Sequence, residues 1–285
     1  MSWEPIAGRH AITLVRTIIV FAQSLPPKPL RASQELVQSR AQELAFTSVE
    51  RVAPSAPEIQ IQLGPALEVA TPHHPAAQSG SVFKRVYSPD GTGQSSYVVE
   101  ELGLRDNCFG YVATEYNRWA DYESRLRAVL APSLEKALDV TDIASLQLEY
   151  HNLFVFRGPS EMYSSRGLFR RDFSHVPANA ISHQDHWEVT MSWARDSDHL
   201  EARELYERRY RGVQAQPGGI GPPIPGMQIV NGLTVHFNNE APTSESVWSA
   251  LDVVHRLVML EFETTMSQEM NDRLNIRKEE YMLSQ

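Results

Sequence analysis

The chain has 285 residues, of which 42% are hydrophobic and 21% are charged, and its formal net charge is −9. This length suits one large domain or two of ordinary size, and the composition argues against intrinsic disorder. The excess of acidic side chains disfavours nonspecific binding of polyanions by the whole surface, but it allows a local basic patch. Cys108 is the single cysteine, which excludes an intramolecular disulfide framework.

Two features of the sequence bear on localisation. The longest apolar runs, such as residues 18–22, are far too short to cross a bilayer. The first residues lack the basic start and the apolar stretch of a signal peptide. We therefore expect a soluble cytoplasmic protein with no membrane partner.

The first half of the chain mixes strand-like alternation with helical periodicity. Pro132 lies inside a helical pattern, where it either kinks the helix or ends one helix and starts another. In chain order we expect a strand at 10–22, a helix at 31–46, a strand at 59–63, a meander of strands at 82–87, 97–102 and 108–116, an amphipathic helix at 119–134 and a strand at 143–156.

A second half begins near Gly158 with loop composition. It continues with a strand at 187–193, a charged helix at 198–210, a loop rich in Gly and Pro at 216–226, a strand at 232–238, a helix at 244–269 and a helix at 272–283. The sequence thus predicts an α+β fold of two sheet-and-helix halves, residues 1–157 and 158–285. Its strands are mostly antiparallel, and long amphipathic helices pack on them.

Four stretches carry a resemblance to a known family. They are residues 9–21, residues 103–119, the phrase Leu-Glu-Tyr-His-Asn at 148–152, and residues 251–262. In order and content they resemble a family of sporadically distributed bacterial proteins of unknown function. The resemblance implies a two-part α+β fold, and it supplies no substrate, cofactor or active site.

The densest set of candidate metal ligands is His183, Asp185, His186 and Glu188. Imidazole and carboxylate groups suit zinc or the divalent ion of a nuclease. In a strand, however, His183 and Asp185 share one face while His186 and Glu188 share the other. Without a bulge or a turn, at most two of them then reach one ion. The alternative is a polar entrance to the strand.

A second candidate interleaves arginines with aromatic rings. Arg166, Arg170 and Arg171 alternate with Phe169 and Phe173. Guanidinium groups hold phosphates and rings stack on bases, so this segment suits single-stranded nucleic acid. Three further arginines would extend the patch, namely Arg208, Arg209 and Arg211. Nearby acidic residues favour the alternative of paired or solvated surface arginines.

Other motifs are excluded by their context. The glycines at 218–226 are not followed by the Gly-Lys-Ser/Thr ending of a phosphate-binding loop, and the prolines among them remove donors. No Gly-x-Ser-x-Gly elbow and no Cys–His arrangement is visible, and Cys108 inside a strand is typical of a small buried side chain. The sequence points to no particular cofactor and favours a protein without catalysis.

The helix at 244–269 is apolar around most of its circumference. One sheet buries one face, so the extra surface must meet the rest of the chain or a second copy. We expect a symmetric homodimer whose interface includes Trp248, Leu251, His255, Met259 and Phe262. Complete covering within the chain is the alternative.

The functional expectation is a component that binds another macromolecule or assembles with itself. The first alternative is a metal-dependent enzyme such as a nuclease, acting through His183, Asp185, His186 and Glu188. The second is a nucleic-acid-binding member of a mobile or defence-associated gene cluster, acting through Arg166, Arg170 and Arg171.

Overall fold

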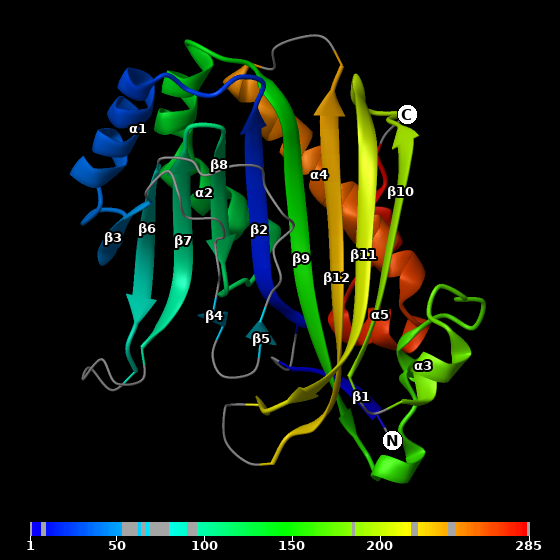
Figure 1. Ribbon diagram of the computed structural model, residues 1–285. Helices are drawn as coiled ribbons and strands as arrows, with labels where there is room; N and C mark the ends of the chain where they lie inside the picture. Colours follow the sequence, from blue (N-terminus) through cyan, green and yellow to red (C-terminus); the bar gives the residue numbers. More distant parts are fainter. Residues whose placement is uncertain are drawn as a thin grey trace. The chain divides into compact units, whose positions relative to one another are not determined.

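The computed structural model of the chain is shown in Figure 1. It describes residues 2–6, 10–52, 62–63, 67–68, 80–89, 96–183, 186–217, 222–238 and 243–283. Among these residues, no helix is both long enough and apolar enough to span a bilayer.

Ten strands of the described residues form one large, mostly antiparallel sheet, in the order β10-β11-β12-β9-β2-β8-β7-β6-β3, with β1 paired to β9. Two short strands, β4 and β5, form a separate pair. The bounds are β1 Ser2–Pro5, β2 Ile12–Phe21, β3 Ser48–Val52, β4 Gln62–Leu63, β5 Leu67–Glu68, β6 Gly80–Tyr87, β7 Tyr97–Arg105, β8 Cys108–Ala113, β9 Ile143–Arg157, β10 Trp187–Asp196, β11 Ala202–Ala215 and β12 Ile224–Phe237.

Helices complete a mixed α+β fold, as the sequence predicts. Their bounds are α1 Pro27–Ser39, α2 Trp119–Leu138, α3 Ala178–Ser182, α4 Ser244–Thr265, α5 Gln268–Leu274 and α6 Lys278–Tyr281, with short 3-10 turns at Ser160–Met162 and Ser165–Leu168. Pro132 lies inside the single helix α2.

The chain divides into two compact units whose segments interleave along the sequence. Unit 1 consists of residues 1–15, 148–235 and 250–285, and unit 2 consists of residues 16–147 and 236–249. The predicted boundary at residue 157 lies inside unit 1. Neither unit is therefore one continuous stretch of chain.

Unit 1 has its core between strands and the helices that lie behind β11 and β12 (Figure 1). Aromatic and methionine side chains from distant segments meet there, including Phe169, Tyr210, Met227, Phe262 and Met266. Burial of these large apolar side chains is the main stabilising contribution to the unit. This core supports the site described below.

Unit 2 combines the meander β6, β7 and β8 with helices α1 and α2. Figure 1 shows α2 behind β7 and β8. Ser33 of α1 and Ser133 of α2 exchange hydrogen bonds, each hydroxyl donating to the other residue's carbonyl at 3.3 and 3.2 Å. Both serines are fully buried. Small side chains at these positions let the two helices approach closely.

Most of the predicted strands are confirmed. The opening strand, the three strands of the meander with their antiparallel pairing, the long strand β9 and the strand β10 all form near the expected residues. The predicted strand at 59–63 lies mainly outside the described residues. Strand β12 begins at Ile224, inside the segment expected to be a loop, so Pro225 and Gly226 are accommodated within a strand.

The predicted charged helix at 198–210 is wrong, because strand β11 occupies this region. Its residues alternate in burial from Ala202 to Tyr210, with Glu204, Tyr206 and Arg208 buried between exposed or partly exposed neighbours. A period of two fits a strand, and pairing with β10 over ten residues satisfies its backbone. Tertiary pairing thus overrides the helix propensity of a charge-rich segment.

Two helix boundaries also differ from expectation. Helix α1 begins at Pro27, because prolines are tolerated in the first turn, and it ends at Ser39. Helix α4 ends at Thr265, and α5 begins at Gln268 after the cap Ser267, whose hydroxyl accepts a hydrogen bond from the Met270 N–H. This break lies inside the predicted helix at 244–269 and forms one wall of the cleft described next.

Candidate functional site

A cleft of about 720 Å³ opens in unit 1 between the segment after β9 and the junction of α4 and α5. Its volume lies in the range of typical ligand sites. The lining residues are Arg166, Gly167, Phe169, Arg170, Arg171, Asp172, Glu263, Met266, Ser267, Gln268, Glu269 and Asn271. The three arginines predicted as a nucleic-acid patch therefore line a single cleft.

Backbone hydrogen bonds fasten one wall of this cleft to the other. The Arg170 N–H donates to the Thr265 carbonyl at 3.1 Å, and the Ser267 N–H donates to the Leu168 carbonyl at 2.8 Å. The Ser267 hydroxyl adds a third bond, to the Gly167 carbonyl at 3.0 Å. Because both walls are tied at the same place, the cleft has a fixed width at its base.

The three arginines have different roles. The Arg166 guanidinium donates to the backbone carbonyls of Phe173, at 2.7 Å, and of Arg171, so it holds the arginine segment in shape. Arg170 is half exposed and lies 3.6 Å from Asp172. The side chain of Arg171 is exposed and makes no hydrogen bond or ion pair with other described residues. Arg170 and Arg171 thus remain accessible for an incoming anion.

The second wall is acidic and amide-rich, and none of the predicted sites includes it. Asn271 donates from Nδ2 to the Glu263 carbonyl at 2.9 Å. Glu269 pairs with Arg273 at 2.8 Å, and the Gln268 amide donates to Asp272 at 2.9 Å. The one local signal for this wall is Ser267, a favourable helix cap followed by an acidic residue in the first turn of α5.

The aromatic part of the predicted patch does not have its expected role. Phe169 and Phe173 stack on each other with ring centroids 4.6 Å apart, and both belong to the core of unit 1. Their exposed fractions are 3% and 8%. These rings support the cleft from beneath and leave little surface on which a base could stack.

The three further arginines do not extend the patch. Arg208 is buried and binds Glu261 and the Thr265 hydroxyl. Arg209 and Arg211 bind Glu188 at 3.6 and 2.6 Å. None of the three lines the cleft.

The predicted metal ligands are not gathered into a site within the described residues. His183 and His186 are exposed, and Glu188 is paired with arginines of β11. Asp185 lies outside the described residues. In the described part of the chain, no group of three or more His, Cys, Asp or Glu side chains is placed to hold a metal ion.

The predicted interface residues of α4 are all buried in the single chain. Trp248, Leu251, His255, Met259 and Phe262 have exposed fractions between 0% and 8%. His255 lies 2.9 Å from the Tyr150 hydroxyl, and burial lowers the pKa of its ring to about 3. The apolar circumference of this helix therefore offers no exposed surface at these positions for a second copy.

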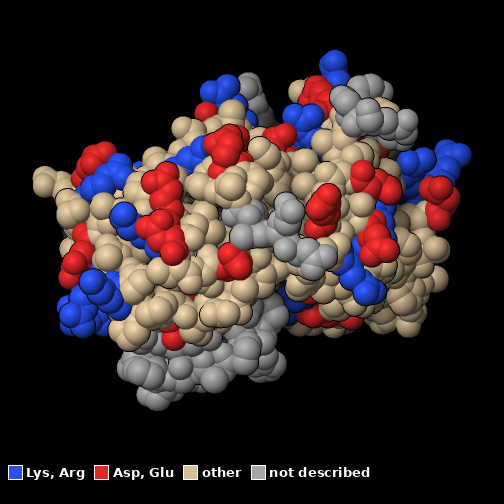
Figure 2. Space-filling view, turned by 90° about the horizontal axis from the view of Figure 1, so that it is seen from above, with Lys and Arg blue, Asp and Glu red and all other residues tan. Residues whose placement is uncertain are grey.

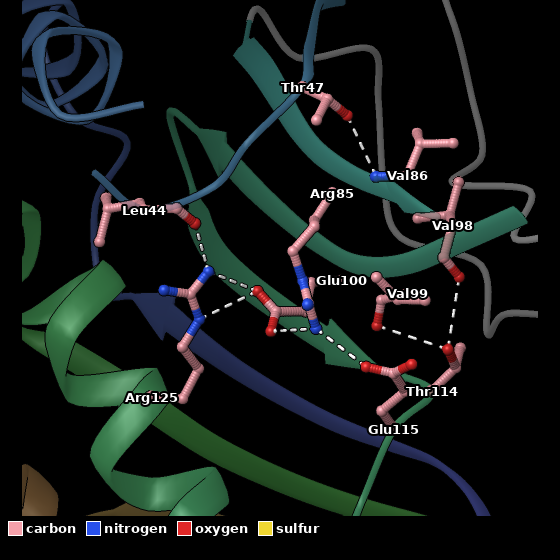
Figure 3. A network of polar contacts seen from close by, with 10 residues as sticks. All are labelled: Leu44, Thr47, Arg85, Val86, Val98, Val99, Glu100, Thr114, Glu115 and Arg125. Carbon is pink, nitrogen blue, oxygen red and sulfur yellow. Dashed lines mark hydrogen bonds and ion pairs between the residues drawn. The ribbon is translucent and has the colours of Figure 1, made fainter. Parts of the chain in front are cut away.

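Unit 2 contains a network of charged side chains centred on the buried Glu100 (Figure 3). Arg125 donates to Glu100 at 2.6 Å and to the Leu44 carbonyl, while Arg85 bridges Glu100 and Glu115 at 2.9 and 3.1 Å. Two guanidinium groups balance two carboxylates, so the network leaves no free charge for a ligand.

No protein-family model matches this chain, and no curated protein matches it. The resemblance to the bacterial family therefore stays a prediction.

Proposed function

We propose that the protein is a non-catalytic binding component that holds single-stranded nucleic acid in the arginine-lined cleft. The observation that carries this proposal is the meeting of Arg166, Arg170 and Arg171 on one cleft, with Arg171 free of partners among the described residues. Guanidinium groups bind phosphate oxygens through charge-assisted and often bidentate hydrogen bonds.

The charges around the cleft favour contact with few phosphates. Asp172 lies 3.6 Å from the half-exposed Arg170, and Glu269 lies 2.8 Å from Arg273. On the face shown in Figure 2, basic and acidic residues lie intermingled instead of gathering by sign. We therefore expect local contact through Arg170 and Arg171, with affinity falling by a slope of about −1.4 in log–log salt plots for two phosphates of a single strand.

The described residues give less support to the other expected functions. Self-assembly through α4 rested on an uncovered apolar arc, and its predicted residues are buried within the chain. A metal-dependent nuclease needs ligands that the described residues do not bring together. Membership of a mobile or defence-associated gene cluster, a cytoplasmic location and a protein or homo-oligomeric partner stay predictions.

Fluorescence anisotropy with labelled single-stranded DNA and RNA octamers tests the proposal. The variant Arg170→Ala/Arg171→Ala should weaken binding at least tenfold, because it removes both accessible guanidinium groups. The matched control is Arg31→Ala/Arg51→Ala, which removes the same charge from exposed arginines without partners among the described residues. Equal affinity of the cleft variant and the parent, or no binding by the parent, overturns the proposal.

A further inference from the structure

The large sheet has one long, open edge in unit 1. Strand β10 stands last in the strand order, and among the described residues it pairs with β11 alone (Figure 1). This pairing runs over ten residues without a register shift. Beyond it, no backbone hydrogen bond joins β10 to another described residue. The outer N–H and C=O groups of β10 therefore form an unpaired row, which can accept a further strand.

The strand at the other end of the order, β3, differs from β10. It has only five residues, and Glu50 and Arg51 place charges in its middle. Short length, charge, proline and bulges are the usual means by which edge strands avoid pairing. In β10 the stretch from Val189 to Ala194 contains no charged residue and no proline, and its pairing with β11 shows no bulge. This edge is therefore unprotected, which is typical of an interface.

The two faces of β10 differ in polarity. One face carries a half-buried row of apolar side chains, two of which pack against the core of unit 1, and the opposite face is polar and exposed. The apolar row consists of Trp187, Val189, Met191 and Trp193. A strand added at this edge must continue the row on the same face to cover it. The occupant must therefore alternate between apolar and polar residues as β10 does.

We propose that β10 pairs with β10 of a second copy of the chain, antiparallel and about a two-fold axis. The two sheets then become one continuous sheet. This interface does not involve the buried residues of α4, and it does not depend on what the cleft binds. A two-fold axis between identical antiparallel strands stands perpendicular to the sheet, so each face of β10 continues into the same face of its copy.

The sequence of β10 is complementary to itself in one such register. With Met191 opposite its own copy, Val189 lies opposite Trp193, and Trp187 lies opposite Arg195. The apolar row thus continues through both copies, and no like charges stand opposite each other. Aromatic and β-branched residues that face each other across a strand pair stabilise the sheet.

The neighbouring two-fold registers are less favourable. A centre at Ser192 would place Glu188 opposite Asp196, and like charges directly opposite each other are destabilising. A centre at Thr190 would pair only residues 187–193, whereas a centre at Met191 pairs residues 187–195. The self-pairing is therefore specific in register as well as in face.

Light scattering after size exclusion gives the first test. The full-length protein should have a mass close to twice the 32.2 kDa of one chain. A mass near 32.2 kDa for the parent protein overturns the proposal.

Charged variants assign the dimer to β10. Thr190 and Ser192 are exposed and lie opposite each other in the proposed register. Thr190→Lys/Ser192→Lys therefore brings lysine against lysine and should give a monomer, and so should Thr190→Asp/Ser192→Asp. An equimolar mixture of the two variants should form a mixed dimer, because lysine then faces aspartate. The matched control is Ala32→Lys/Gln38→Lys on the exposed surface of α1, which adds the same charge and should leave the dimer intact.

Cysteine cross-linking tests the register. In a Cys108→Ala background, Met191→Cys places two thiols directly opposite each other, so a mild oxidant should link the two chains. Val189→Cys is the control, because its counterpart lies several residues along the partner strand, and it should remain unlinked.

Each result supports or overturns the proposal. A lysine variant that stays dimeric, or a mixture of the two charged variants that stays monomeric, overturns pairing through β10. Cross-linking at Val189→Cys but not at Met191→Cys overturns the register. If the lysine variant fails to fold, as circular dichroism would show, the mass of the parent protein and the cross-linking of the cysteine variants still decide.

Discussion

The indole of Trp193 lies flat against the phenol ring of Tyr206, with ring centroids 5.2 Å apart and planes 2° from parallel. The two residues are direct partners in the antiparallel pair of β10 and β11. Arginines extend this stack at both ends, because Arg208 lies 5.0 Å from the Trp193 ring and Arg195 lies 4.8 Å from the Tyr206 ring. The stack fixes the register of the segment that was expected to be a helix.

Replacing Trp193 should destabilise unit 1 through the loss of this stack. We expect Trp193→Ala to lower the free energy of unfolding by about 2 kcal/mol, since an aromatic pair and a cation–π contact are lost together with apolar contact area. Urea denaturation followed by circular dichroism measures the change. Leu205→Ala is the control, because Leu205 is 39% exposed, and it should change stability by about 0.5 kcal/mol or less. Similar effects of the two substitutions would contradict this account.

The buried ion pair of Arg208 with Glu261 should behave asymmetrically on substitution. Arg208→Met leaves the partly buried Glu261 carboxylate without its cation, so we expect a loss of about 2–4 kcal/mol in unfolding free energy. The double variant Arg208→Met/Glu261→Gln should lose less than Arg208→Met alone, because no unpaired charge remains. A double variant that is the least stable of the three would show that the pair contributes more than its desolvation costs.

His255 should make the protein sensitive to acid. Burial lowers the pKa of its ring to about 3 in the folded chain, against an ordinary value of 6.5. Between these values His255 is protonated in the unfolded chain and neutral in the native chain. Its contribution to the free energy of unfolding is therefore complete above pH 6.5 and decreases as the pH falls toward 3. The contribution of this residue should be about 1.4 kcal/mol per pH unit within that window.

The variant His255→Gln tests this pH dependence, since glutamine does not titrate. Its unfolding free energy should fall less steeply than that of the parent between pH 6.5 and 4.5. Carboxylates shared by both proteins cancel in the comparison. Parallel curves would show that His255 is protonated in the native state or is not buried there.

Cys108 should be nearly inert as a nucleophile. Burial raises the pKa of its thiol to about 11, from an ordinary value of 9.0. At pH 8 the thiolate fraction is then lower by about 100-fold than in the unfolded chain. By its exposed surface, Cys108 is partly buried. Labelling with a thiol-reactive disulfide should be slow in native protein and fast in urea, and equal rates would refute the raised pKa of its thiol.

The predictability of the fold varies with how local its causes are. Strands β2 and β9 and the meander carry their runs of β-branched and other apolar residues within six to fifteen positions, so the sequence predicts them. Strand β11 is not predictable in this way. Its acidic and basic residues favour a helix by themselves, and the strand forms because Trp193 and its neighbours in β10 pair with it. The end of α4 is not predictable from the local sequence for a similar reason. Ser267 is held by hydrogen bonds to the carbonyls of Gly167 and Leu168, about a hundred residues away.

The cleft shows the same division. Its basic wall comes from one short segment that includes Arg166, Arg170 and Arg171, and composition alone marks it. Its second wall includes Glu263 and Asn271, which belong to two different helices and meet the arginines only in the folded chain. Neither residue stands in a recognisable motif, so only the tertiary structure reveals it.

The interleaving of the two units has a consequence for how the protein is made. Unit 1 uses residues 1–15 together with residues 250–285, and the Arg273 guanidinium donates to the Trp3 carbonyl across 270 positions of sequence. At a synthesis rate of about 5–20 residues per second, residues 250–285 therefore leave the ribosome tens of seconds after the first strand. Throughout that interval the growing chain must protect apolar strands that only its last segment can cover. Nascent chains arrested before residue 250 should accordingly be more accessible to proteases and chaperones than the released protein.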